Sequence, residues 1–177
     1  MNIELGRHDE ALEQAERALA AGQDRGRRWI QAGILNTIAA AHRERGHLDR
    51  ALRAGSRALA LARASGYRRT EADCVLGVSV THRRLGRYDE ARAHAEEALG
   101  LARTHAFGVV EGQALTALSA TAQREGADAT AGELGHEALA VHRRTGHRLG
   151  EARTLLILGM RQQALDIFAD VGVPAAE

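Results

Sequence analysis

Nine histidines and one cysteine are the side chains with which this 177-residue chain could perform metal or nucleophilic chemistry. A zinc site on one helix needs two histidines four residues apart on the same face. The stretch HEALAVH instead places His136 and His142 six residues apart. His42 and His82 lie forty residues apart, but the same step leads next to Ala122, which supplies no third ligand. We therefore expect no metal site and no cofactor.

The single cysteine, Cys74, stands beside Val75 in the middle of an apolar helical pattern. A reactive thiol needs an accessible, positively charged setting and a nearby base. We therefore expect Cys74 to be a buried packing residue. The sequence also contains no phosphate-binding loop, no glycine-rich dinucleotide turn and no G-x-S-x-G elbow. These features predict that the protein is not an enzyme, and no catalytic residue is assigned.

Composition favours an all-α protein without a membrane span. Aromatic residues make up only 3% of the chain and proline occurs once, which fits helices better than sheets. No apolar run approaches the roughly 20 residues that span a bilayer, and no signal sequence is evident, so we expect a cytoplasmic location. All 24 basic residues are arginine, and the net charge of +1 provides no overall field for nucleic acid or an acidic membrane.

The elements that position these residues come from an internal repeat. The stretch LGRYDEARAHAEEALGLA, residues 85–102, is echoed at 45–62 and at 5–22. Matching residues recur every forty positions. They are Gly6, Gly46, Gly86 and Gly126, then Ala11, Ala51, Ala91 and Ala131, then the Ala-Leu pairs that begin at Ala18, Ala58, Ala98 and Ala138.

Apolar residues inside each period follow helical spacing, and glycines stand where each run ends, so each period predicts a helical hairpin. The first helices are expected over 28–45, 68–85 and 108–125, and the second helices over 8–21, 48–64, 88–104 and 128–144. Further turns are expected at Gly26, Gly66, Ala106 and Gly146. Small residues mark where two helices must approach closely, namely Ala39, Ser79 and Ser119 on the first helices and Ala51, Ala91 and Ala131 on the second.

The organisation that follows is one array over residues 1–177. It comprises a partial repeat at 1–25 that contains only a second helix, full repeats at 26–65, 66–105 and 106–145, and a truncated repeat at 146–177. An apolar stripe from Leu149 to Val171 keeps helical spacing throughout, so we expect one long capping helix over 148–170. Two short helices broken at Gly159 are the alternative.

This spacing resembles the tetratricopeptide repeat in a longer, forty-residue form. Leu35, Val75 and Leu115 match the Trp position of that family, and His42 and His82 match its Tyr position. The resemblance implies a right-handed superhelix of helical hairpins that binds proteins. Where the family carries Phe in the second helix, this chain has Ala15, Gly55, Ala95 and Gly135. Tight backbone packing or modest stability is expected at those positions.

The tail phrases EARTLLILGM and QQALDIFADVGVP resemble the C-terminal repeats of actinobacterial transcription regulators of the SARP/NB-ARC type. That resemblance implies a regulatory or sensor array that binds a protein or peptide partner. In the family, the first helices line an inner groove. The matching partner-binding positions here are Asn36, Arg43, Asp73, Leu76, Val80, Arg83, Arg84, Gln113, Thr116, Gln123, Arg124 and Arg153.

The arginines of this groove fit a partner with acidic groups, because guanidinium binds carboxylate in a planar, bidentate geometry. The other interpretation is a solvated rim whose arginines form surface ion pairs with Glu44 and Glu125. Two further functions stay open. One is a receptor for a signalling peptide or small ligand, with a pocket lined by Leu76, Val80 and Arg83. The other is a self-associating scaffold, in which a homodimer covers the helix over 8–21.

The turns between repeats are basic, as in RGRR, YRR and RRTGHR, whereas the second helices are rich in glutamate. Turns that recur every forty residues are expected to stack along one edge. No aromatic residues are interleaved with the arginines, so direct binding of nucleic acid is not expected.

Overall fold

The computed structural model describes residues 28–172, and this part of the chain is entirely α-helical, as the sequence predicts. It divides into two compact units at Glu90 and Ala91, here called unit 1 and unit 2. The predicted helix over 8–21, the turn at Gly26 and the homodimer contact assigned to that helix lie outside the described residues. The helices are α2 (Arg28–Glu44), α3 (Leu48–Ser65), α4 (Arg68–Arg84), α5 (Tyr88–Thr104), α6 (Gly108–Arg124), α7 (Asp128–Thr145), α8 (Arg148–Ile157) and α9 (Arg161–Asp170).

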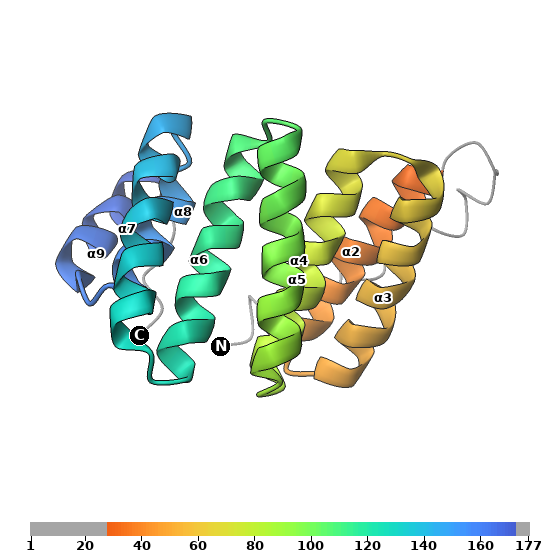
Figure 1. Ribbon diagram of the computed structural model, residues 1–177, viewed down its shortest axis with the longest axis horizontal. Helices are drawn as coiled ribbons and strands as arrows, with labels where there is room; N and C mark the ends of the chain where they lie inside the picture. Colours follow the sequence, from red (N-terminus) through yellow and green to blue (C-terminus); the bar gives the residue numbers. More distant parts are fainter. Residues whose placement is uncertain (1–27, 173–177) are drawn as a thin grey trace. The chain divides into compact units, whose positions relative to one another are not determined.

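Unit 1 is a hairpin of α2 and α3 with α4 packed against both helices (Figure 1). Leu35, Ile38, Val75 and Val78, which recur at helical spacing, are buried in its core. Two first helices, α2 and α4, therefore lie in contact with each other, and α3 contacts both of them.

Unit 2 contains α6 to α9 and most of α5. Its α7 contacts both α6 and α8, and α6 also contacts α8, so the arrangement of first and second helices seen in unit 1 is repeated. Leu115, Ala138 and Val141 form one buried cluster. Among the described residues, no helix combines the length and the apolar character needed to cross a bilayer.

The predicted turns are confirmed. Gly46, Gly86 and Gly126 adopt left-handed backbone angles, with φ of +75°, +74° and +77°. This conformation lets the N–H of His47 donate to the carbonyl of His42 at 2.9 Å, which satisfies a group that the helix end would leave unpaired. At the other kind of turn, Ala106 adopts φ of +56°, a conformation that costs a residue with a β-carbon about 1 kcal/mol or more.

The prediction of one helix over 148–170 is wrong. Helix α8 ends at Ile157 and α9 begins at Arg161, and Gly159 between them has φ of +76°. The N–H groups of Gly159 and Met160 donate to the carbonyls of Leu156 and Leu155, which closes α8. The apolar stripe misled the prediction because its residues on both sides of the break still face one core. Ala152, Leu155, Ala164 and Ile167 share a cluster with Leu139.

The small residues predicted at the helix crossings are buried as expected. The hydroxyl of Ser119 on α6 donates to the carbonyl of Ala131 on α7 at 2.7 Å, so the two backbones approach closely there. The glycines expected to mark tight packing do so. A β-carbon built on Gly55 would lie 3.3 Å from Val78, and one built on Gly135 would lie 2.7 Å from Leu158.

Helix α7 offers a matched pair of glycines with which to test this packing. Replacing Gly135 with Ala is expected to lower the free energy of unfolding by about 1 kcal/mol, because overpacking against Leu158 and Ser119 exceeds the gain in helix propensity. Replacing Gly132, which has nothing within 4 Å of a built β-carbon, is expected to raise it by about 0.5–1 kcal/mol. Urea unfolding followed by circular dichroism measures both. Equal effects of the two substitutions would contradict close packing at Gly135.

Candidate protein-interaction surface

The contact between α2 and α4 in unit 1 brings together the first group of predicted partner-binding residues. The side-chain amide of Asn36 on α2 donates to the main-chain carbonyl of Asp73 on α4, with an N–O distance of 3.4 Å. Both residues are half-buried. Asn36 lies in the third turn of α2 and Asp73 in the second turn of α4. The predicted face is therefore formed by the two helices together.

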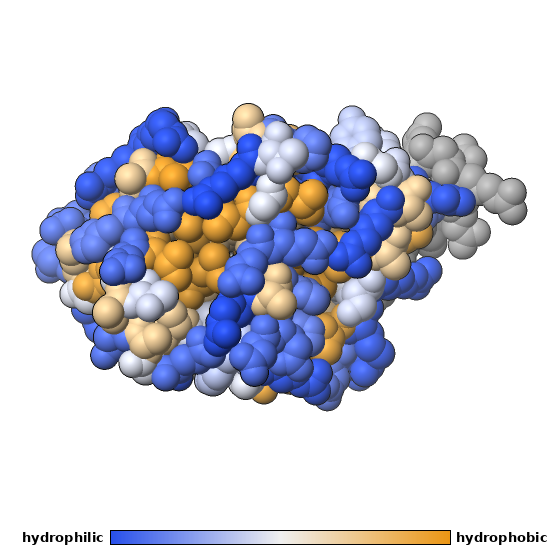
Figure 2. All heavy atoms as spheres, viewed as in Figure 1, coloured by the Kyte–Doolittle hydropathy of each residue, from blue (hydrophilic) through white to orange (hydrophobic). Residues whose placement is uncertain are grey.

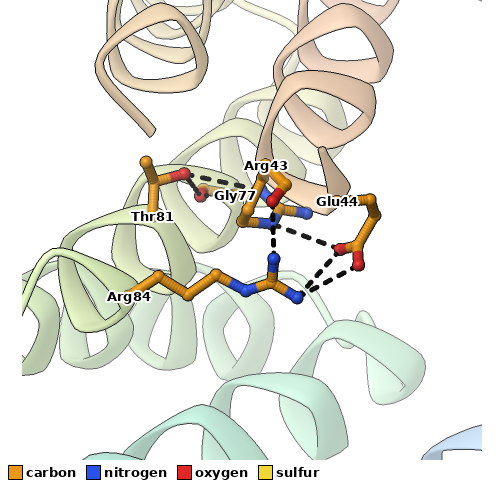
Figure 3. Close-up of polar contacts among 5 residues, drawn as sticks. All are labelled: Arg43, Glu44, Gly77, Thr81 and Arg84. Carbon is orange, nitrogen blue, oxygen red and sulfur yellow. Dashed lines mark hydrogen bonds and ion pairs between the residues drawn. The ribbon is translucent and has the colours of Figure 1, made fainter. Parts of the chain in front are cut away.

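Arg43 joins the same two helices nearer their C-terminal ends (Figure 3). Its Nη1 lies 3.3 Å from the carbonyl of Gly77 and 3.5 Å from the hydroxyl of Thr81. Only 13% of the Arg43 side chain is exposed. The guanidinium group is therefore used mainly within unit 1, where it links α2 to α4.

Arg84 returns a contact from α4 to α2 (Figure 3). It donates to the main-chain carbonyl of Arg43 at 2.6 Å and to both carboxylate oxygens of Glu44, at 3.0 and 3.2 Å. This is the ion pair with Glu44 that the sequence offered as the second interpretation of the groove arginines. Because 38% of the Arg84 side chain is exposed, its attraction to Glu44 is screened by solvent.

Between these polar links lie Leu76 and Val80 of α4, both half-buried, with Arg83 also half-buried one turn further on. Asp73 is paired with Arg69 on its own helix at 3.2 Å. Burial raises the pKa of Asp73, and the charge and hydrogen bond of Arg69 only partly oppose this effect. Unit 1 thus presents a short apolar strip with polar groups at both ends.

The remaining predicted residues belong to unit 2, and they differ in how much of each side chain is available to a partner. Arg124 and Arg153 are exposed, and Gln113 is half-buried. Thr116 is turned inward, since its hydroxyl lies 3.0 Å from Nε2 of His142 and 2.9 Å from the hydroxyl of Thr154. Gln123 donates from its side-chain amide to the carbonyl of Ile157 on α8 at 3.0 Å.

Gln123 and Arg43 occupy the same position two periods apart, and so do their acceptors, Ile157 and Gly77. In both units this position therefore carries a side chain that bonds the main chain of the next first helix. The residue type differs, but the link is the same. The structure thus gives this position a role in holding first helices together, in addition to any role in binding a partner.

The turns between repeats contain a set of residues that the sequence interpretation missed. A glutamate stands in the first turn of α4, α6 and α8. It pairs with an arginine that lies eight residues earlier, at the end of the preceding helix. The pairs are Arg63 with Glu71 at 3.7 Å, Arg103 with Glu111 at 3.3 Å and Arg143 with Glu151 at 2.9 Å. The forty-residue spacing of both partners was the signal that could have revealed them.

Arg68 and Arg148, at the starts of α4 and α8, add second pairs to Glu71 and Glu151, at 2.7 and 2.8 Å. The side chains of these two glutamates are only 7% and 8% exposed. Burial by itself would raise the pKa of Glu151, but the hydrogen bonds and charges of Arg143 and Arg148 together lower it. The basic turns are therefore largely balanced by carboxylates, which weakens any attraction to phosphate groups.

The structure places Cys74, which was considered above as a nucleophile, among the packing residues of the core. Cys74 is completely buried, and burial together with the nearby Asp73 and Glu71 raises the pKa of its thiol to about 12. The thiol therefore stays protonated at neutral pH and is a poor nucleophile. Within residues 28–172, no group of three or more His, Cys, Asp or Glu side chains is arranged to hold a metal ion.

The comparisons with known proteins agree with this geometry. The model of the tetratricopeptide repeat family matches residues 30–104, from the start of α2 to the end of α5. The match covers less than half of the chain. The forty-residue hairpin, the small residues at its crossings and the paired first helices within this segment are consistent with that match.

Solved structures resemble a larger part of the chain. The apo form of RapI aligns with a TM-score of 0.77 and 15% identity over 94% of this chain, which spans 63% of that structure. BtubC (BKLC) from P. vanneervenii aligns with a TM-score of 0.69 and 16% identity, over 97% of this chain and 77% of that one. The tetratricopeptide-like repeats of a putative kinesin light chain from Podosopora anserina align with a TM-score of 0.60 and 17% identity, over 94% of this chain and 86% of that one.

At sequence identities of 15–17%, these similarities show only that the folds are alike. No curated protein matches the sequence. The comparisons therefore support a tetratricopeptide repeat scaffold and leave the partner to be inferred from the surface itself.

The buried glutamates of the turns can be tested in unit 2. Replacing Glu151 with Gln is expected to lower the free energy of unfolding by about 1–2 kcal/mol at neutral pH, because its two charged hydrogen bonds are lost from a nearly buried site. The difference from the unmodified protein should vanish in acid, as the pH falls below 4.5 and through the lowered pKa of Glu151. Urea titrations at several pH values measure it.

Glu137 supplies the control, because it pairs with Arg103 while both side chains are 49% exposed. Its replacement with Gln should change stability by less than about 0.5 kcal/mol. A loss at Glu137 as large as that at Glu151 would show that burial of the carboxylate is not what makes the turn pairs stabilising.

Proposed function

We propose that this protein is an interaction module that binds a peptide or protein segment on the face shared by α2 and α4. The observation that carries the proposal is the strip formed by Leu76 and Val80, which the fold leaves half-exposed between polar groups on neighbouring first helices. Asn36 stands at one end and Arg83 and Arg84 stand at the other. In unit 2 the proposed contacts are Gln113, Arg124 and Arg153.

The chemistry of the strip suggests the class of partner. Apolar side chains of the partner would cover Leu76 and Val80, and acidic groups would pair with the arginines beyond them. Asp73 is already paired with Arg69, which reduces the repulsion that an acidic partner would meet at the other end. An extended or helical segment with apolar residues followed by carboxylates fits this order.

The biological setting is proposed from the tail of the sequence. Its phrases EARTLLILGM and QQALDIFADVGVP resemble the repeats of actinobacterial transcription regulators of the SARP/NB-ARC type. In that setting the array is the regulatory or sensor part of a cytoplasmic regulator in antibiotic biosynthesis. A partner bound on its first helices would then report a signal to the rest of the regulator.

The test is partner capture from a lysate of the native host, followed by titration of the identified partner against the purified chain. Replacing Leu76 with Asp is expected to weaken that affinity at least tenfold, because a charge in the apolar strip must be desolvated when the partner binds. Isothermal titration calorimetry measures the change.

Ala60 is exposed on α3, a helix that supplies none of the proposed contacts, so its replacement with Asp is the matched control. This variant adds the same charge and should bind as the unmodified chain does. Equal affinities for the two Asp variants would remove the α2 and α4 face from the proposal, while circular dichroism verifies that both are folded.

A second candidate function, self-association as a scaffold, is favoured by one observation. Apolar surface gathers over α6 and α7 of unit 2 in the view of Figure 2. Exposed apolar patches of this kind often mark protein contacts. If the patch joins two copies, light scattering at increasing protein concentration should show the mass rising toward twice that of the chain. A constant monomer mass at high concentration excludes this function.

A further inference from the structure

Helix α7 carries an imidazole at a position where the other repeats carry a methyl group. His142 corresponds to Ala62 and Ala102 at the forty-residue period, and all three residues are buried, His142 completely. A neutral alanine is thus replaced by a titratable side chain in the interior of unit 2. This substitution interrupts the apolar pattern of the array.

Two glycines make the room that this ring needs. A β-carbon built on Gly112 of α6 would lie 2.7 Å from the His142 ring, and one built on Gly150 of α8 would lie 2.3 Å from it. The residues that correspond to Gly112 are Ala32 and Ala72, both buried. The histidine and its glycines therefore form a fitted set, in which the ring on α7 packs directly against the backbones of α6 and α8.

The Nε2 side of the ring faces hydroxyl groups. Nε2 lies 3.0 Å from Oγ1 of Thr116, and that oxygen lies 2.9 Å from Oγ1 of Thr154. The hydroxyl of Thr116 also lies 2.8 Å from the carbonyl of Gly112, and that of Thr154 lies 2.8 Å from the carbonyl of Gly150. Each hydroxyl has only one proton to donate among these contacts, so the network accommodates either neutral tautomer of His142.

The Nδ1 side of the ring faces a second histidine. Nδ1 of His142 lies 3.2 Å from Nδ1 of His147, the residue that precedes α8, and the ring centroids are 5.1 Å apart. One of these nitrogens must accept while the other donates, so the contact holds a single proton. Either ring can be the donor.

We propose that the contact between His142 and His147 is an acid-released latch that holds the start of α8 against α7. At neutral pH one proton lies between the two Nδ1 atoms, and the latch is closed. In acid each ring gains a proton, so two N–H groups and two positive charges face each other at a contact distance. Gly112 and Gly150 pack closely on the ring of His142, so the repulsion is relieved by moving His147, and with it the start of α8, away from α7.

The charged groups around the pair do not rescue the doubly protonated state. From α8 the neighbours are Glu151, Arg148 and Arg153, from α7 Arg143 and Arg144, from α6 Glu111, and from α5 Arg103. Glu151 is held by Arg143 and Arg148, and Glu111 by Arg103 and Arg144. Burial and the charge of His147 lower the pKa of His142 to about 4, against smaller opposite effects of Glu151 and of a hydrogen bond to the backbone of Gly112, while burial and Arg153 lower the pKa of His147.

The direction of the pH dependence follows from these shifts. The unfolded chain takes up protons on both histidines near pH 6.5, whereas the folded chain takes up the His142 proton only near pH 4. Between those values the unfolded state binds more protons, so stability falls as the pH falls. Glu151 has a lowered pKa, so the stability that it contributes is lost only below pH 4.5, largely outside the range in which the histidines act.

The latch is tested by measuring the unfolding equilibrium in urea at pH 7.5, 6.5, 5.5 and 5.0. For the unmodified chain we expect the folding constant to fall about tenfold or more between pH 6.5 and 5.0. Replacing His147 with Asn keeps a neutral donor near the place of Nδ1 and should reduce that fall, and replacing His142 with Ala should remove most of it. His136 is an exposed histidine on the same helix, so its replacement with Ala should leave the fall unchanged.

An NMR pH titration of the unmodified chain gives an independent reading that needs no variant to fold. The ring signals of His142 should titrate well below pH 6.5 and shift again when His147 is protonated. A His142 pKa near 6.5, or the same fall in the folding constant for the His147→Asn and His136→Ala variants, would overturn the latch.

Discussion

The close approach of neighbouring helices at alanine, serine and glycine positions is the constraint on which the rest of this structure depends. A helix of this array cannot cover its apolar face alone and must share it with helices of its own and the next repeat. Ser119 bonding the main chain of Ala131, and Gly135 beneath Leu158, show how little space separates the partners. Larger side chains at these places would push the helices apart and expose the leucines and valines that form the core.

Polar side chains complete what the apolar core begins. Arg43 and Gln123 bond the main chain of the next first helix, and the buried Glu71 and Glu151 receive arginines across the turns. Such contacts are directional, so they fix the alignment of one helix on the next in a way that apolar packing does not. They also use arginines that would otherwise be available to a partner, which leaves the strip of Leu76 and Val80 as the better candidate for recognition.

Departures from the repeat show where this array differs from a uniform scaffold. At most positions the three periods carry similar residues, and the environment is similar in both units. At His142 the residue changes, and Gly112, Gly150, Thr116 and Thr154 differ with it. In the proposed latch, a set of coordinated changes around one buried titratable ring gives unit 2 an acid response that Ala62, the corresponding residue of unit 1, cannot provide.

Much of this could be predicted from the sequence alone. The forty-residue period, the apolar spacing and the glycines located α2 to α7 to within a residue of their observed bounds, because helix formation and left-handed turns depend on nearby residues. The same local information identified Cys74 and the small residues at the crossings as buried. Only the tertiary structure decided that Gly159 divides the last segment, that Arg43 is bound to Gly77, and that His142 meets His147, because each depends on groups brought together by packing. The spacing of apolar residues predicts which face of a helix is buried. It does not predict which atoms of the neighbouring helix contact that face.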